Sequence, residues 1–175
     1  GPRAIALDLD RARLAPVSDS FAVLVQGNTF GYQVGALERD GDGWVYRERS
    51  QLATIASQTT EVRMGADLAM RAVTQSGRLQ GQEMRLSVAY AGGTASGEGV
   101  TPGPAGMAPV KYDGAAVPAG SVDDNAVLAL LPYLRWAAGA KLQLSVFESG
   151  KGVAQVRTFE VVGEETVTVP MGTVE

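Results

Sequence analysis

The sequence contains no cysteine and no histidine among its 175 residues. The absence of cysteine excludes disulfides, thiolate metal sites and thiol nucleophiles, and it leaves the redox compartment open. The absence of histidine removes the commonest general base and metal ligand at neutral pH, and with it any Ser-His-Asp triad. We therefore expect no metal, no cofactor and no enzymatic activity. These absences do not exclude hydrolysis by two carboxylates, because that reaction needs only aspartate and glutamate.

Positive charge is also scarce. The lysines are Lys111, Lys141 and Lys151, the formal net charge is −4 and the pI is about 4.9. Proteins that bind nucleic acid usually carry a basic patch, and anionic membranes attract polybasic clusters; neither occurs here. No apolar run approaches the roughly 18 residues that a membrane-spanning helix requires. The sequence therefore predicts neither a nucleic-acid partner nor a transmembrane segment.

Short alternating segments separated by glycine and aspartate make up most of the chain. We predict turns at residues 40–43 (DGDG), 76–77 and 92–93, and a loop over residues 101–106 (TPGPAG) because its prolines and glycines do not suit a central strand. Strands at roughly 8–12-residue spacing, joined by such turns, are typical of an antiparallel meander.

The segment that reads as a helix is residues 121–136 (SVDDNAVLALLPYLRW). Ser121 or Asp123 can cap its first turn, and Pro132 should end or kink it. The segment is apolar on nearly every side, which indicates enclosure by other structure. We therefore predict a mainly β (α+β) fold, in which a curved antiparallel sheet or incomplete β-barrel wraps around one buried helix. Residues 1–175 form a single domain, with residues 1–15 as an arm or an edge strand.

Two acidic motifs have a structural interpretation as well as a chemical one. The DGDG sequence resembles the start of a calcium loop, but the twelfth position from Asp40 is Gln51, where such a loop needs glutamate, so a hairpin turn is favoured. Asp123 and Asp124 could form a paired-carboxylate site. At the start of a helix they complement its dipole, and we favour that structural role.

Aromatic residues suggest where a ligand could bind. Phe30, Tyr32, Trp44 and Tyr46 lie on two predicted strands that flank the DGDG turn. They can pack against the helix as cross-strand pairs, which we favour, or line an apolar cleft for a lipid or peptide. The candidate ligand-binding residues are these four together with three helix leucines: Phe30, Tyr32, Trp44, Tyr46, Leu128, Leu131 and Leu134.

Four stretches resemble a bacterial envelope family, the domain of unknown function 3108. They are GNTFGYQVGALERDGDGWVYRE, TEVRMGADLAMRAVTQSGRLQGQ, DDNAVLALLPYL and FEVVGEETVTVPMGTVE, and the resemblance runs from about Leu14 onward. The last is similar to the family's recurrent G-x-E-x-V-x-V-P-A-G-T-F pattern, with Met171 in place of alanine and Val174 in place of the aromatic residue. The resemblance implies a curved sheet partly enclosing a helix, similar to the lipoprotein carriers LolA and LolB, in a periplasmic or outer-membrane-associated protein. It carries over no catalytic residues.

Further strands follow this pattern in the family, so we expect C-terminal strands that are either missing from the sequence or supplied by another chain. The Gly1-Pro2 start resembles the scar of a cleaved tag, which is consistent with a removed signal peptide. The leading hypothesis is a non-enzymatic envelope protein that binds a lipid or a lipoprotein in the concave face of a half-barrel. The alternatives are a structural or interaction module completed by strand addition from a protein partner at the C-terminal edge, and a carboxylate hydrolase.

Overall fold

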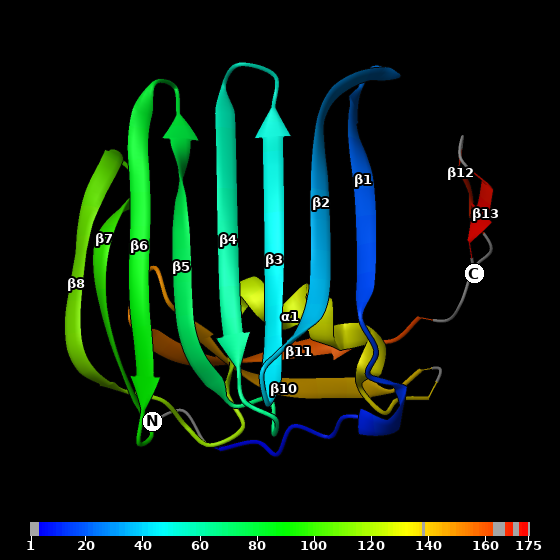
Figure 1. Ribbon diagram of the computed structural model, residues 1–175, viewed down its shortest axis with the longest axis vertical. Helices are drawn as coiled ribbons and strands as arrows, with labels where there is room; N and C mark the ends of the chain where they lie inside the picture. The colour runs from blue at the N-terminus through cyan, green and yellow to red at the C-terminus, as the bar shows by residue number, and fades with distance from the viewer. Residues whose placement is uncertain (1–3, 138, 163–166, 170–171, 175) are drawn as a thin grey trace.

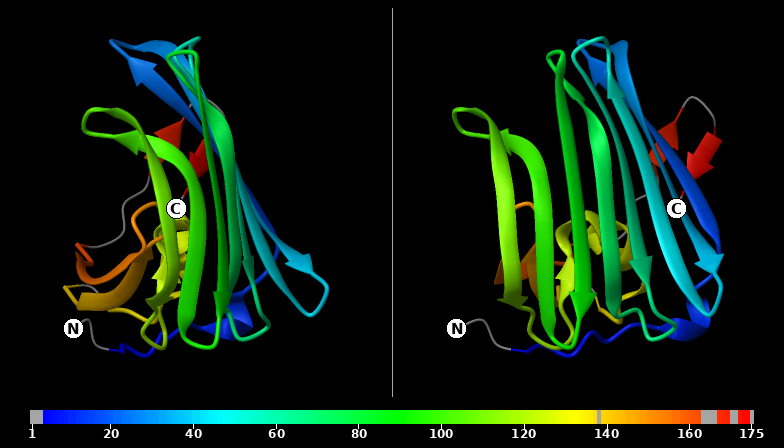
Figure 2. Two further views of the ribbon diagram at one scale, coloured as in Figure 1. Left: turned by 90° about the vertical axis from the view of Figure 1, so that its left-hand side faces the viewer. Right: turned by 60° about the vertical axis from the view of Figure 1, so that its left-hand side comes forward.

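Eight antiparallel strands in chain order form the main sheet of the computed structural model, which describes residues 4–137, 139–162, 167–169 and 172–174 (Figure 1). The strands are β1 (Val17–Val25), β2 (Asn28–Asp40), β3 (Gly43–Leu52), β4 (Ala56–Met64), β5 (Met70–Leu79), β6 (Gln82–Ala91), β7 (Thr94–Gly103) and β8 (Gly106–Ala116). The sheet is strongly curved and does not close, so β1 and β8 are its two edges (Figure 2). The predicted mainly β fold with a curved, incomplete barrel is confirmed.

The two ends of the sheet differ, and we name them by their turns. The closed end carries the turns at residues 41–42, 65–69 and 92–93; the open end carries those at residues 26–27, 53–55, 80–81 and 104–105. The predicted DGDG hairpin is confirmed, since Asp40 pairs with Gly43 across a turn in which Gly41 has a positive φ of 60°. The predicted turn at residues 92–93 is confirmed as well.

A second, smaller sheet covers the concave side near the closed end (Figures 1 and 2). It consists of β9 (Val122–Asp123), β10 (Lys141–Glu148) and β11 (Val153–Glu160), with β10 in the middle. Between β9 and β10 lie the 3-10 helix η2 (Asp124–Ala126), the α-helix α1 (Val127–Leu130) and the 3-10 helix η3 (Leu131–Tyr133). Successive side chains of a strand point to opposite faces of its sheet, so each sheet can bury one apolar face against the other sheet.

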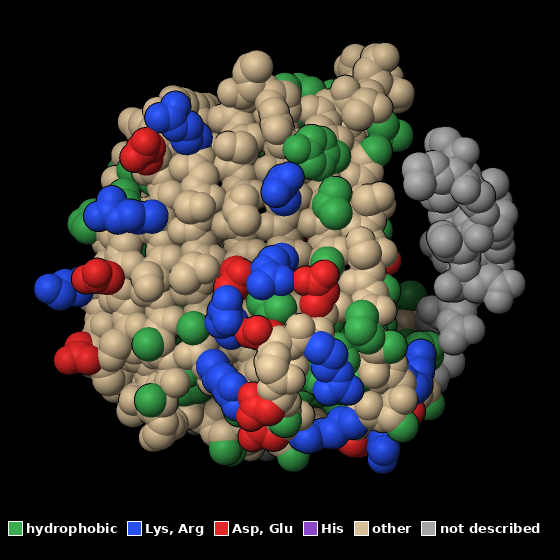
Figure 3. All heavy atoms as spheres, in the orientation of Figure 1, with side chains coloured by type: hydrophobic (Ala, Val, Ile, Leu, Met, Phe, Trp, Pro, Cys, Tyr) green, Lys and Arg blue, Asp and Glu red, His purple; other side chains and the backbone are tan. Residues whose placement is uncertain are grey.

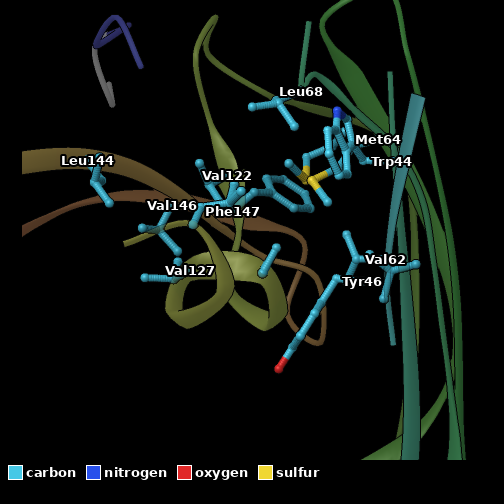
Figure 4. Packing of buried hydrophobic residues seen from close by; sticks show 14 of the residues in the cluster. Trp44, Tyr46, Val62, Met64, Leu68, Val122, Val127, Leu144, Val146 and Phe147 are labelled. Carbon is cyan, nitrogen blue, oxygen red and sulfur yellow. The ribbon is translucent and has the colours of Figure 1, made fainter. Parts of the chain in front are cut away.

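The hydrophobic core fills the space between the two sheets at the closed end. Trp44 and Met64 of the main sheet converge on Phe147 of β10 (Figure 4). The Phe147 ring also makes edge-to-face contacts with Tyr90, at 5.5 Å between ring centroids, and with Tyr112, at 6.0 Å. Such aromatic pairs stabilise beyond their buried area. This closed-end core joins the two sheets into one body.

The long helix predicted over residues 121–136 is wrong. The α-helical part is the four residues of α1, because Val122 and Asp123 extend to pair in parallel with Val146 and Phe147 of β10. Pro132 lies in the first turn of η3, and the α-helix ends before it, as predicted. The helical segment is also not buried on all sides, since Leu128 is 70% exposed while Val127 and Leu130 are buried.

Two predicted breaks between strands are also wrong. Residues 76–77 lie inside β5, and the turn is at residues 80–81. Gly77 is there because a side chain at this position would collide with the backbone of Ser57 in β4, so this glycine permits a close approach. The TPGPAG segment is mostly strand, since β7 runs to Gly103 and β8 begins at Gly106.

Residues 4–16 run along the closed end as an extended arm with one short 3-10 turn, η1 (Arg11–Arg13). Leu9 is buried and bridges to Leu134, and the Asp10 amide donates a 2.7 Å hydrogen bond to the Tyr133 carbonyl. Near the other terminus, β12 (Val167–Val169) and β13 (Gly172–Val174) pair with each other as an antiparallel two-stranded sheet. The sequence Gly163-Glu164-Glu165 predicts a further turn, which lies outside the described residues.

Candidate ligand-binding face

The open-end half of the concave face is the part of the main sheet that the second sheet does not cover (Figure 2). Residues directly opposite each other in antiparallel strands share a face, so the registers define this surface. Its middle carries five half-buried polar side chains: Gln33, Glu48, Ser50, Gln58 and Gln75. We call this surface the open face.

Hydrogen bonds order the polar middle of the open face. Glu48 accepts from Gln33 Nε2 at 2.7 Å and from the Tyr46 hydroxyl at 3.0 Å. Burial, and then the charge of Glu48, raises the pKa of Tyr46, which keeps that hydroxyl a donor. Gln75 Nε2 donates to Thr60 Oγ1 at 3.1 Å and to Asn125 Oδ1 at 3.3 Å, which ties the sheet to η2. The polar groups are therefore fixed in place before any ligand arrives.

Apolar side chains form the outer rim of the open face, nearer the open end. By register Phe21, Val23, Leu52 and Leu79 lie on the concave side. Phe21 is 63% exposed, and Leu128 of α1, on the same side of the sheet, is 70% exposed. Exposed large apolar side chains that gather in one region mark binding surfaces more often than chance. A polar middle beside an apolar rim suits an amphiphilic molecule.

The seven residues predicted to bind ligand do not form one site. Trp44 and Tyr46 are on the concave face but buried in the closed-end core, whereas Phe30 and Tyr32 are exposed on the convex face. The register explains the separation: Tyr32 lies opposite Gln51, and Tyr46 lies opposite Leu37. The predicted cross-strand aromatic pairs are therefore wrong, although Trp44 and Tyr46 do pack in the core as favoured.

The three helix leucines also separate. Leu134 is buried against the arm, Leu131 is half-buried at the edge of the core, and Leu128 is exposed. The aromatic pattern of the sequence does not point to the polar residues of the open face. One signal was available: a two-residue turn at 41–42 fixes the β2–β3 register, and this places Glu48 opposite Gly35 on the concave side.

Asp123 and Asp124 belong to a buried polar cluster and not to an open site. Asp123 is fully buried; its Oδ1 accepts from the Asn125 amide at 2.9 Å, and its Oδ2 accepts from the Tyr90 hydroxyl at 2.5 Å. Asp123 is the N-cap of η2, which confirms the capping prediction for this residue. Asp124 Oδ1 accepts from the Ser149 amide at 3.3 Å.

Burial, followed by the charge of Asp124, raises the pKa of Asp123 to about 6. The hydrogen bonds from Tyr90 and Asn125 act in the opposite direction without cancelling that shift. Within the described residues no group of three or more acidic side chains is placed to hold a metal ion. The cluster links the main sheet, η2 and β10, so its geometry is that of a structural junction.

A cleft of about 550 Å³ lies at the closed end, between the arm and the turns of the main sheet. Its lining includes Leu7 and Arg11 of the arm, Met70, Tyr90 and Gly120. Arg11 donates to the Asp67 carbonyl at 3.0 Å, so its guanidinium is already used to hold the arm. None of the predicted ligand-binding residues lines this cleft. The other charged residue in its lining, Asp67, accepts a hydrogen bond from the Ala69 amide at 3.1 Å.

The fold defines a class: an open antiparallel half-barrel, filled at one end by a small second sheet and uncovered at the other. The chain belongs to the family described as protein of unknown function (DUF3108), whose family model matches residues 37–175. The match begins within β2, later than the resemblance noted from about Leu14, so β1 lies outside it. No curated protein and no solved structure matched the chain. Across the described residues, no helix is long and apolar enough to cross a membrane.

Proposed function

We propose that this chain is a non-enzymatic protein of the bacterial cell envelope that binds an amphiphilic ligand, a lipid or the acyl chains of a lipoprotein, on the open face. The observation that carries the proposal is the uncovered half of the concave sheet. It combines fixed polar groups around Glu48 and Gln75 with exposed apolar side chains, of which Leu128 and Phe21 are the most exposed. The envelope location rests on the family resemblance.

The two parts of the open face suit the two parts of an amphiphile. Acyl chains gain free energy by covering apolar rim residues such as Leu52 and Leu79, at about 25 cal/mol per Å² of apolar surface removed from water. A polar head group with donors can bond to Glu48, and one with acceptors can bond to the amides of Gln33 and Gln58. A purely apolar ligand would remove from water the donors and acceptors that these internal hydrogen bonds leave unused, which is costly.

The carboxylate hydrolase alternative has weaker support. Such an enzyme needs two carboxyl groups that face a substrate. Asp123 has no exposed surface and its oxygens are occupied by Tyr90 and Asn125, as described above. The pair Asp123 and Asp124 therefore supports folding better than it supports catalysis.

The test is binding of a naturally fluorescent polyunsaturated fatty acid, titrated into the purified protein. Leu128→Asp should weaken binding by about tenfold or more, because burying a leucine side chain contributes about 1.5–3 kcal/mol and 1.4 kcal/mol is a factor of ten. The matched control is Val162→Asp, since Val162 is 91% exposed and lies beyond the end of β11. Equal affinity for all three proteins, or no saturable binding to the wild type, would contradict the proposal.

A further inference from the structure

The two edges of the main sheet are built differently. Edge strands present unpaired N–H and C=O groups, and soluble proteins usually protect them with proline, charged residues or bulges. β8 has such protection, since it contains Pro109, Lys111 and Asp113 and its pairing with β7 shifts register near Gly97. β1 contains no proline and a single charged residue, Asp19. Its pairing with β2 shifts register between Val23 and Leu24, so residues 17–23 are the unprotected part of this edge.

The free backbone groups of β1 can be located from the pairing. The Ala53 amide donates to the Phe30 carbonyl at 2.8 Å, so the backbone groups of Phe30 and of the alternate residues after it point toward β3. Gln33 and Gly35 therefore point toward β1, where they lie opposite Phe21 and Asp19. Ser18, Ser20 and Ala22 must then direct their N–H and C=O groups away from β2. Nothing in the described part of the chain pairs with this edge, and nearly all of β1 is exposed.

Side chains beside this edge define what it would accept. Phe21 and Val23 lie on the concave side and are flanked by the apolar rim. Asp19 lies in one cross-strand row with Gly35 and Glu48, so the backbones of the two acidic residues are about 10 Å apart with a glycine between them. Neither carboxylate forms an ion pair with a described residue of the chain. A basic side chain of a neighbouring strand could bond to Asp19 and reach over Gly35 toward Glu48.

We propose that β1 is a strand-addition site for another polypeptide, which pairs along Ser18, Ser20 and Ala22 and carries a basic residue opposite Asp19 and apolar residues opposite Phe21 and Val23. This interaction uses the backbone edge of the sheet and is independent of amphiphile binding on the open face. It also differs from strand addition at the C-terminal edge, because the unprotected edge is formed by β1. Main-chain hydrogen bonds supply the affinity and the side chains supply the selectivity.

The probe is a fluorescently labelled peptide of sequence TTVTVTKTV, whose nine residues match the length of β1 and whose lysine falls opposite Asp19 in antiparallel register. Binding is measured by fluorescence anisotropy. Ser20→Pro removes one outward N–H without touching a bond to β2, so affinity should fall by about tenfold. Ser20→Thr keeps the N–H and is the matched control, expected within about twofold of the wild type.

The charge requirement is tested separately, without relying on the fold of the proline variant. The peptide TTVTVTETV, with glutamate in place of lysine, should bind the wild type at least about fivefold more weakly, and Asp19→Asn should remove most of that difference. Equal binding of the two peptides to the wild type, or equal binding by the Ser20→Pro and Ser20→Thr proteins, overturns the proposal. So does a wild-type dimer in sedimentation that Ser20→Pro dissociates, because the occupant would then be a second copy of β1.

Discussion

The closed-end and open-end halves of the main sheet share the same strands but have different side chains. At the closed end, β3 and β4 contribute Trp44, Tyr46, Val62 and Met64 to the concave face, and all are buried. Four residues further along the same strands, that face carries Ser50 and Gln58, both half-buried. The convex surface differs too, since charged side chains gather over its closed-end half (Figure 3).

The difference shows how one sheet separates stability from recognition. Burial of apolar area at the closed end supplies the free energy that holds both halves, because the strands are continuous. The open end therefore does not have to form a core, and it can expose polar and apolar groups together. We expect substitutions at the closed end to act mainly on stability and those at the open end mainly on binding.

Truncating the centre of the closed-end core should have the largest effect. Trp44 is 2% exposed, contacts Phe147 and Met64 in the core cluster, and has the Arg39 guanidinium 4.0 Å above its ring. Trp44→Ala should reduce the free energy of unfolding by about 3–5 kcal/mol. Chemical denaturation followed by circular dichroism measures this change.

The matched substitution in the other half is Leu79→Ala, at the rim of the open face. Leu79 is half-buried, so its truncation should cost about 1 kcal/mol or less. The comparison of the two halves fails if Leu79→Ala destabilises the protein as much as Trp44→Ala does, since the open face would then be part of the core.

Sequence reasoning predicted which residues of a strand share a face, but not how neighbouring strands align. Along β3, Trp44 and Tyr46 face the concave side and Val45 and Arg47 the convex side, as the alternation of a single strand requires. That alternation says nothing about β2, whose phase depends on the length of the turn. Alternation within each strand therefore does not reveal that Tyr32 and Tyr46 lie on opposite faces of the sheet.

Local sequence patterns also do not predict which distant segments pair with each other. The apolar character of residues 121–136 indicated enclosure, and this is correct for only part of the segment, since Leu128 is exposed. The cause of the enclosure is not a long helix: Val122 pairs with Val146 and Leu134 bridges to Leu9. Each pairing joins segments separated by more than 20 residues. The sequence pattern at Gly77 predicts a turn, but the reason for this glycine is steric. The nearby backbone of Ser57 becomes evident only when β4 and β5 are aligned.

A second effect, of intermediate size, is a pH dependence confined to the closed-end half. The pKa of Asp123 is raised from 3.8 to about 6, so between these values the folded protein binds more protons than the unfolded chain. Stability should therefore rise as the pH falls, and from pH 7.5 to pH 5 the gain is about 1 kcal/mol. Thermal or urea unfolding at the two pH values measures it, and Asp123→Asn should abolish the gain.

Glu148 does not interfere in this window. The hydrogen bonds from Lys151 and Arg157 outweigh partial burial and lower the pKa of Glu148, so its stabilising contribution is lost only as the pH falls below about its ordinary value of 4.5. A wild-type protein that is less stable at pH 5 than at pH 7.5, or an Asp123→Asn protein with the same pH dependence as the wild type, would show that Asp123 does not control the response.

The smallest expected effect is a difference in the stability that ion pairs contribute on the convex surface of the two halves. Near the closed end, Glu61 bonds to Arg47 at 2.9 Å and to Arg63 at 2.7 Å, and its side chain is 25% exposed. Partial burial raises the pKa of Glu61, but these two hydrogen bonds outweigh it and the pKa is lowered. Near the open end, Arg78 and Glu83 form an ion pair at 3.2 Å, and both side chains are highly exposed.

Glu61→Gln should therefore cost about 1 kcal/mol, because a networked and partly buried pair exceeds the usual value, whereas Glu83→Gln should cost about 0–0.5 kcal/mol. Raising the salt concentration should reduce the cost of Glu61→Gln, since Arg47 and Arg63 remain near solvent and their charges are screened. Urea denaturation of both variants at low and high salt measures this contrast. Equal costs for the two substitutions would mean that the charged surface contributes no more at the closed end than at the open end, and that the core alone distinguishes the stability of the two halves.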